Sequence, residues 1–377
     1  MKPALTLAKE TFRNLKPCAH GADTFEAADK TGFRREDILD FSSSVNPLGA
    51  SAKALNAIKG NLDLIPSYPD SNSVALRSAI AAYHDNKITK DNISVGNGST
   101  ELIYLFAEAF MQKGDFALIP APSFSEYENA IRKAGADVEY VKLSENFEVE
   151  PESFIRKISE RTKIIYFCNP NNPTSILTSS AKLTKIIQHA LERNVLIFLD
   201  EDFLEFVENG EEFSLIHRIN EFPNLFILKS FTKIFGLTGL RIGYGIASKE
   251  ITSILMNAKI PWNLNCLGQV AAIAALEDVD HLKMTRDLVR KEKSYIMDNL
   301  KKCESLKVYS PDANFFFIDI RKSGLKAAEL KGKMLKKRIL IRDCTSFPGL
   351  DEYFIRIAVK THSENEKLLE ALKESIG

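Results

Sequence analysis

The stretch that decides the predicted fold is FILKSFTKIFGLTGLRIGYG, residues 226–245. An apolar run, Leu225–Leu228, predicts a short buried strand at its start. Lys233 follows in a polar hinge, and a glycine-rich segment containing Arg241 comes next. A lysine just past a strand, where glycine allows close approach of a ligand, suits a Schiff base with an aldehyde cofactor. The stretch by itself fits a glycine-rich turn with a solvated lysine equally well.

Composition excludes several classes of protein. The chain has 377 residues and equal numbers of basic and acidic side chains, 50 each, so it lacks the basic surface of a nucleic-acid-binding protein. Its five cysteines are scattered and form no CxxC pair, which argues against a disulfide framework and against structural zinc. We find no signal peptide and no apolar run of membrane-spanning length. These features predict a cytoplasmic protein with no metal site and no membrane or nucleic-acid partner.

The order of helical and strand patterns predicts an α/β protein with two domains. Residues 46–265 alternate amphipathic helices with short apolar strands, which predicts a large domain with a mainly parallel sheet and helices on both faces. Residues 1–45 read as an N-terminal arm that packs with a small domain. Residues 266–377 read as an interdomain helix followed by that smaller α+β domain.

Polar motifs follow four of the predicted strands. Ser99 and Thr100 begin a helix and form a cup for a phosphate, Phe124 can stack on a planar ring, and Asn172 can donate to a phenolate-like oxygen. Asp200 ends an apolar strand, where a protonated pyridine nitrogen would serve as its cationic partner. Each motif has a plain alternative as a helix cap, core aromatic, turn or salt-bridged strand end. Because parallel strands share one carboxyl edge, the motifs and the lysine together predict a pyridoxal 5′-phosphate site.

The ordered motifs GNGSTE, PAPSF, NPNNPT, FLDEDF, SFTK, GLRIGY and FIRIAV resemble those of fold-type I pyridoxal phosphate enzymes of the class I/II aminotransferase family over nearly the whole chain. The resemblance implies the aminotransferase-like fold, with Lys233 as the catalytic residue that holds the cofactor covalently. It also implies a homodimer with the active site at the interface, because Tyr68 matches a tyrosine that reaches the neighbouring cofactor. The implied cofactor-binding residues are Tyr68, Ser99, Thr100, Phe124, Asn172, Asp200, Ser230, Lys233 and Arg241.

Within the family, three strings are most similar to threonine-phosphate decarboxylase of cobalamin biosynthesis. These strings are His20-Gly21, PWNLN at 261–265 and ILIRDCTSFPGL at 339–350. Phe203 also stands where a histidinol-phosphate aminotransferase usually has tyrosine. The resemblance implies a small phosphorylated amino acid as substrate, held by His20, Gly21, Ser44, Asn46, Arg342 and Arg356.

The predicted reaction is decarboxylation of O-phospho-L-threonine, with O-phospho-L-serine left open, to the amino alcohol phosphate. The alternatives are a histidinol-phosphate-type aminotransferase and a non-catalytic ligand sensor or scaffold. Three positions depart from the family pattern: Ser44 stands where decarboxylases often have asparagine, Ser175 replaces glycine, and Asp202 replaces a common alanine. Neither Ser175 nor Asp202 removes a group that the mechanism needs, whereas Ser44 either favours O-phospho-L-serine over O-phospho-L-threonine or has no effect.

Overall fold

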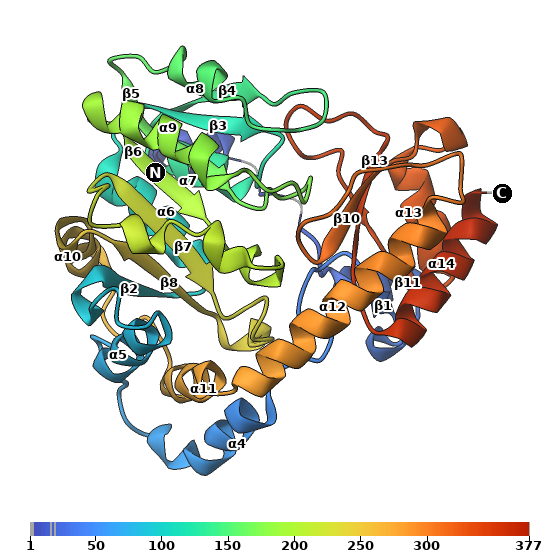
Figure 1. The fold of residues 1–377 in the computed structure, drawn as a ribbon, viewed down its shortest axis with the longest axis horizontal. Coiled ribbons are helices and arrows are strands. Elements are labelled where there is room, and N and C mark those ends of the chain that lie inside the picture. The colour runs from blue at the N-terminus through green and yellow to red at the C-terminus, as the bar shows by residue number, and fades with distance from the viewer. Residues whose placement is uncertain (1–3, 16, 19, 377) are drawn as a thin grey trace.

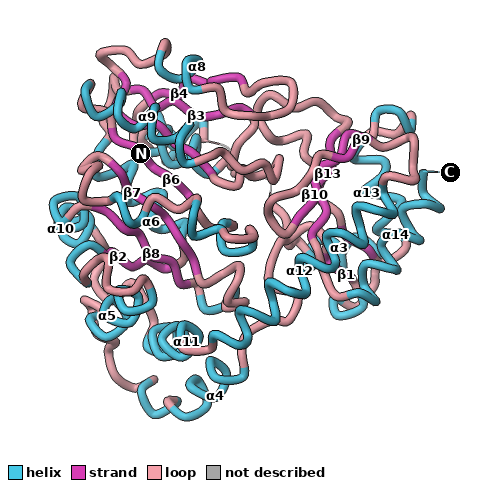
Figure 2. Tube along the Cα trace, viewed as in Figure 1, coloured by secondary structure: helices cyan, strands magenta, loops and turns pink. Residues whose placement is uncertain are grey.

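A computed structural model describes residues 4–15, 17–18 and 20–376, and its main features are two sheets of very different size. A large sheet covered by helices lies on one side, a small sheet lies on the other, and the long helix α12 (Val279–Leu300) joins them (Figure 1). Loop segments occupy much of the region between the two sheets (Figure 2). Within the described part of the chain, no helix is both long enough and apolar enough to cross a membrane.

The large sheet has seven strands in the order β2-β8-β7-β6-β5-β3-β4. Every neighbouring pair is parallel except those of β8, which runs antiparallel to both β2 and β7. This arrangement confirms the predicted mainly parallel sheet, although the sequence analysis missed β8 because its glycines resemble a loop. The strands are β2 (Ile93–Asn97), β3 (Phe116–Ala121), β4 (Asp137–Lys142), β5 (Thr162–Cys168), β6 (Leu196–Asp200), β7 (Leu225–Ser230) and β8 (Ile242–Ala247).

Two hydrophobic cores cover the two faces of this sheet. In β7, Phe226 and Leu228 contribute to one core, and Ile227 between them contributes to the other. Successive side chains of a strand point to opposite faces, so a strand buried on both faces reads as a continuous apolar run. The helices of this unit are α4 (Ala52–Gly60), α5 (Val74–Tyr83), α6 (Ser99–Phe110), α7 (Glu126–Lys133), α8 (Pro151–Ile155), α9 (Ser180–Glu192), α10 (Lys249–Ala258) and α11 (Cys266–Leu276).

Short polar side chains begin several of these helices. The Ser51 hydroxyl accepts a hydrogen bond from the Ala54 amide at α4, and the Ser179 hydroxyl does the same for Lys182 at α9. Asn265 caps α11 through the amide of Gly268. Such caps satisfy amides that have no partner inside the helix. Helix α11 packs against α4 and α5, and the chain crosses to the small sheet through α12.

The small sheet is antiparallel and has the order β12-β13-β10-β9. Its strands are β9 (Lys307–Val308), β10 (Phe315–Asp319), β12 (Arg342–Asp343) and β13 (Phe354–Ala358), with helices α13 (Ala327–Lys336) and α14 (His362–Ile376). Just before β12 lies a separate short strand, β11 (Ile339–Leu340), which belongs to another sheet. β11 pairs in parallel with β1 (Leu39–Asp40) from the N-terminal segment.

The N-terminal segment contacts both units. Its helices are α1 (Ala4–Leu7), α2 (Glu10–Asn14) and α3 (Thr24–Thr31); α2 contacts α7 of the large unit, and α3 contacts α13 of the small unit. This segment therefore passes over the boundary between the units. The predicted domain limits at 45 and 265 stay predictions.

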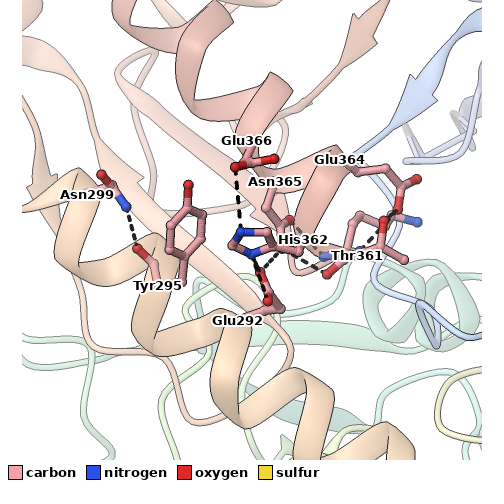
Figure 3. Close-up of polar contacts among 9 residues, drawn as sticks. Glu292, Tyr295, Asn299, Thr361, His362, Glu364, Asn365 and Glu366 are labelled. Carbon is pink, nitrogen blue, oxygen red and sulfur yellow. Dashed lines mark hydrogen bonds and ion pairs between the residues drawn. The ribbon is translucent and has the colours of Figure 1, made fainter.

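A polar cluster around the buried carboxylate of Glu292 joins α12 to the start of α14 (Figure 3). Glu292 on α12 is fully buried, and its carboxylate contacts His362 Nδ1 at 3.0 Å and accepts a hydrogen bond from Asn365 Nδ2 at 2.9 Å. The Tyr295 ring lies 4.5 Å from the His362 ring, centre to centre. Because each of these groups is satisfied by its neighbours, we assign the cluster a structural role in holding α14 on α12.

Candidate active site

A cavity of about 320 Å³ lies at the carboxyl edge of the parallel strands, between the large and small units. Twelve of the predicted site residues line it, and they come from the N-terminal segment, the large sheet and the small sheet. These residues are His20, Gly21, Ser44, Ser99, Thr100, Phe124, Asn172, Asp200, Lys233, Arg241, Arg342 and Arg356.

Three predicted residues do not line the cavity. The Asn46 amide points elsewhere, donating to the Ile234 carbonyl at 2.7 Å and to the Thr285 hydroxyl at 2.9 Å. Tyr68 is 81% exposed and lies against Trp262, outside the cavity of its own chain. Ser230 is buried at the end of β7, just behind the cavity wall. The structure therefore does not bring Asn46 to the substrate as predicted, because its side chain is engaged in holding α12.

Lys233 follows β7 and lines the cavity. Burial lowers the pKa of its amine, and the nearby positive charges of Arg356 and Arg241 act in the same direction. The carboxyl groups of Asp202 and Asp200 oppose this shift. A lower pKa increases the neutral fraction of the amine, which is the form that attacks an aldehyde carbon.

Asp200 is the last residue of β6 and is buried beneath the cavity. Its Oδ2 accepts a hydrogen bond from the Tyr127 hydroxyl at 2.7 Å, and its Oδ1 accepts one from the Asp202 amide at 2.9 Å. Burial, together with the negative charge of Asp202, raises the pKa of Asp200 to about 8. A cation bound beside this carboxylate would compensate its burial, as a protonated pyridine nitrogen would do.

The sequence analysis did not identify Tyr127, the residue that orients Asp200. The Phe124 and Tyr127 rings lie 5.6 Å apart at the start of α7. The motif that supplies the predicted ring-stacking side chain therefore also supplies the partner of the carboxylate. A second aromatic three residues after the first, at the start of a helix, was the available signal.

The predicted phosphate cup is closely packed around two glycines. Gly98 precedes α6 with φ of +81°, and a Cβ there would lie 2.4 Å from Arg241 Nη2. A Cβ on Gly243 would lie 2.4 Å from the Ser99 amide nitrogen. The glycines thus let the Arg241 guanidinium and the start of α6 approach the same point. Free amides at a helix N-terminus and a guanidinium favour a phosphate.

Two buried arginines face the other side of the cavity. The antiparallel register of β12 and β13 places Arg342 directly opposite Arg356. Arg342 donates to the Ser346 hydroxyl at 2.8 Å, and Arg356 donates to the Ser42 carbonyl at 2.7 Å and to Asn172 Oδ1. Burial lowers the pKa of both guanidinium groups, to about 10 for Arg356. Two buried cations at one cavity favour an anionic ligand.

Arg356 also sets the orientation of Asn172. Because Asn172 Oδ1 accepts the hydrogen bond from Arg356, the remaining Nδ2 group is the donor available to a ligand. This orientation agrees with the predicted contact to the phenolate-like oxygen of the cofactor.

His20 reaches the cavity from the N-terminal segment. Its Nε2 lies 2.9 Å from Glu126 Oε1, and Glu126 Oε2 accepts a hydrogen bond from the Tyr104 hydroxyl at 2.5 Å. Although burial acts to raise the pKa of Glu126, the hydrogen bonds from His20 and Tyr104 lower it overall. Gly21 is needed beside His20, since a Cβ there would lie 2.4 Å from the Ser42 carbonyl oxygen. Glu126 was not predicted as part of the site.

The residues present fit pyridoxal 5′-phosphate. Buried polar atoms of three cavity-lining residues have no hydrogen-bond partner within the described chain, namely Ser44 Oγ, Asp202 Oδ1 and Arg356 Nε. Lys233 would hold the aldehyde carbon, Asp200 the pyridine nitrogen, Asn172 the ring oxygen, and the cup beside Arg241 the phosphate. The bound cofactor would supply an electron sink that stabilises negative charge on the substrate.

The comparisons with known proteins all point to one family. The family described as Aminotransferase class I and II matches residues 36–372. The histidinol-phosphate aminotransferase of Methanosphaera stadtmanae is 33% identical over 359 residues, covering 94% of this chain and 95% of that protein. The crystal structure of the Clostridium acetobutylicum histidinol-phosphate aminotransferase has a TM-score of 0.84 and 34% identity, covering 90% of this chain and 99% of that one.

These relatives overturn the predicted decarboxylase. The L-threonine-O-3-phosphate decarboxylase of Porphyromonas gingivalis has a TM-score of 0.79 and 28% identity, covering 89% of this chain and 99% of that one. It is therefore less similar than the Clostridium acetobutylicum enzyme in both measures. The three strings that suggested decarboxylation are short, and identity over nearly the whole chain outweighs them. The predictions of lyase activity and of a role in cobalamin biosynthesis depended on the decarboxylase and are therefore not supported either. The chain belongs to the aminotransferase class I and II family, and its cofactor is pyridoxal 5′-phosphate.

Proposed function

We propose that the protein is an aminotransferase that takes the amino group from L-histidinol phosphate or a similar phosphorylated amine. The observation that carries this proposal is the identity of 33% to histidinol-phosphate aminotransferases over nearly the full length. The facing arginines Arg342 and Arg356 support an anionic substrate, because a phosphate would compensate both buried charges.

The residues around the cavity can each carry out a separate part of amino transfer. Lys233 Nζ takes the proton from the substrate Cα, which is general base catalysis by an amine whose pKa is already lowered. Asp200 would hold a proton on the pyridine nitrogen of the bound cofactor, and Tyr127 fixes the orientation of the Asp200 carboxylate. Histidinol phosphate has no carboxylate on Cα, so with this donor the Cα–H bond is the one available to break.

We also propose that two copies of the chain form the working enzyme. A set of exposed apolar side chains lies on α4, the turn that follows it and the loop before α11: Leu55, Leu62, Ile65, Tyr68, Ile260 and Trp262. The Tyr68 and Trp262 rings contact each other with centres 4.8 Å apart. An exposed apolar surface of this kind favours association, and the exposure of Tyr68 outside the cavity of its own chain supports a contact with the site of a second copy.

The test of the activity is a coupled assay with L-histidinol phosphate and 2-oxoglutarate. We expect glutamate to form in proportion to the donor consumed, together with a visible absorbance band from the bound cofactor. Release of CO₂ from O-phospho-L-threonine without glutamate formation would contradict the proposal. Sedimentation analysis tests the dimer separately, and a monomer with full activity would exclude the role of Tyr68.

A further inference from the structure

A second buried carboxyl group lies beside the phosphate cup. Asp202 is 8% exposed and lines the cavity just beyond β6. Its Oδ2 accepts a hydrogen bond from the Ser99 hydroxyl at 3.2 Å, and its Oδ1 is buried without a partner in the described chain. Ser99 is the first residue of α6, so the carboxyl group touches one of the residues predicted to bind the phosphate.

This placement creates an electrostatic conflict. The cup contains the start of α6 and Arg241, which favour an anion, but an ionised Asp202 would repel a phosphate placed there. The repulsion would be strong, because buried charges are poorly screened by solvent. A protonated carboxyl group removes the repulsion and adds a donor, since its hydroxyl can reach an oxygen of the phosphate.

We propose that Asp202 holds a proton when the cofactor phosphate is bound and donates it in a hydrogen bond to a phosphate oxygen, so that cofactor binding takes up a proton from solvent. No other bond forms or breaks in this step. The inference depends on the cofactor and is independent of which amine the enzyme uses.

The groups around Asp202 are consistent with a carboxyl group that protonates readily. Burial raises the pKa of Asp202, whereas the positive charges of Lys233 and Lys229 and the hydroxyls of Ser230 and Ser99 lower it. The net effect is a raised pKa. The other titratable groups that interact with Asp202 are Asp200, Glu205, Cys168 and Tyr244. A bound phosphate would add a further negative charge and raise the pKa of Asp202 more.

The first test measures proton uptake directly. Pyridoxine 5′-phosphate has the ring and phosphate but no aldehyde, so it forms no bond with Lys233. Its binding to the apoenzyme is measured calorimetrically near pH 8 in two buffers with different ionisation enthalpies. We expect the wild type to take up about one more proton per ligand than Asp202→Asn, because the amide donates a hydrogen bond without titrating.

The second test uses sulfate, which remains a dianion and brings no proton of its own. Its affinity for the wild-type apoenzyme should fall by up to about tenfold for each pH unit above the pKa of Asp202, and this fall should be weaker in Asp202→Asn. Asp312→Asn is the matched control, because burial also raises the pKa of Asp312 but the residue lies outside the cavity. It should retain the wild-type pH dependence.

Lys233 and Asp200 also titrate, and the loss of a positive charge at one or the gain of a negative charge at the other would weaken anion binding at high pH. The comparison is therefore repeated with the double variant Lys233→Gln/Asp200→Asn as the parent. A pH dependence that persists in this double variant supports the proposal, even if Asp202→Asn fails to fold. Equal proton uptake by the wild type and Asp202→Asn, or loss of the pH dependence in the double variant, would overturn it. Neither assay uses an amino donor, so failure here is distinct from failure of the proposed activity.

Discussion

Two buried carboxyl groups of this protein have opposite surroundings. Glu292, between α12 and α14, is fully buried, and His362 and Asn365 satisfy its oxygens at 2.9–3.1 Å. Asp202, at the cavity, is nearly as buried, but one of its oxygens has no partner in the described chain. The comparison teaches that burial alone does not identify a functional acid. What distinguishes the two is whether the fold itself satisfies the buried group.

The same distinction applies to Arg356, a buried arginine that lines the cavity. Arg356 is 7% exposed, and its Nε has no partner in the described chain although its other nitrogens donate to Ser42 and Asn172. An incompletely paired buried cation and an incompletely paired buried acid line the same cavity, which marks it as the place where a ligand completes the structure. The Glu292 cluster is complete without one. Substitutions on the two sides should therefore have different consequences.

The largest effect is expected from Lys233→Ala. Loss of the amine that binds the cofactor and carries the proton should reduce kcat by roughly 10⁴-fold and remove the visible absorbance band. The melting temperature of the apoenzyme should change little, because the lysine side chain lines the cavity. Absorbance spectra and steady-state kinetics check this, and a retained visible band would contradict the assignment.

A smaller loss is expected from Arg342→Ala. Removing one of the two facing cations should lower kcat/KM for histidinol phosphate by about 100-fold, because a buried charge-assisted contact with the substrate is lost. The cofactor spectrum should be preserved, since the arginine faces the opposite side of the cavity from the phosphate cup. Arg338→Ala, at an exposed position in the same region, is the control. Unchanged kinetics in Arg342→Ala would exclude it from substrate binding.

Glu292→Gln should affect stability and leave the chemistry intact. The amide replaces an acceptor with a donor that faces His362, so we expect a decrease of about 2 kcal/mol in the free energy of unfolding. The kcat of the folded fraction should remain at the wild-type value. Thermal denaturation followed by assay at a low temperature separates the two. A large fall in kcat without loss of stability would mean that this cluster acts on the active site.

The smallest effect is expected from Tyr127→Phe. This change removes the 2.7 Å hydrogen bond to Asp200 and keeps the ring, so cofactor affinity should fall by about tenfold, equivalent to about 1.4 kcal/mol. The hydrogen bond from Tyr127 lowers the pKa of Asp200, so its loss should raise that pKa further. Cofactor release by dialysis at several pH values measures both. An unchanged affinity would show that the Asp202 amide orients Asp200 without Tyr127.

The sequence by itself determined the large sheet and the cofactor side of the cavity. Asp200 and Lys233 each follow a run of apolar residues, and Ser99 begins a helix directly after a strand. Parallel strands all end at one edge, so residues that follow them meet there whatever the details of packing. The glycines of β8 hid one strand, because Gly243 and Gly245 alternate with its bulky residues and make the segment resemble a glycine-rich loop.

The tertiary structure decided the contacts between distant segments. Arg342 faces Arg356 because two short strands pair in one antiparallel register, and a shift of one residue would turn one side chain away. His20 contacts Glu126, and Asn46 turns toward α12. The sequence offers each of these side chains several polar partners, and the packing of the chain decides which of them lies within reach. The packing of the chain also leaves one oxygen of Asp202 without a hydrogen-bond partner among the described residues. Local sequence specifies which groups are present, whereas only the assembled fold decides which of them are left for a ligand.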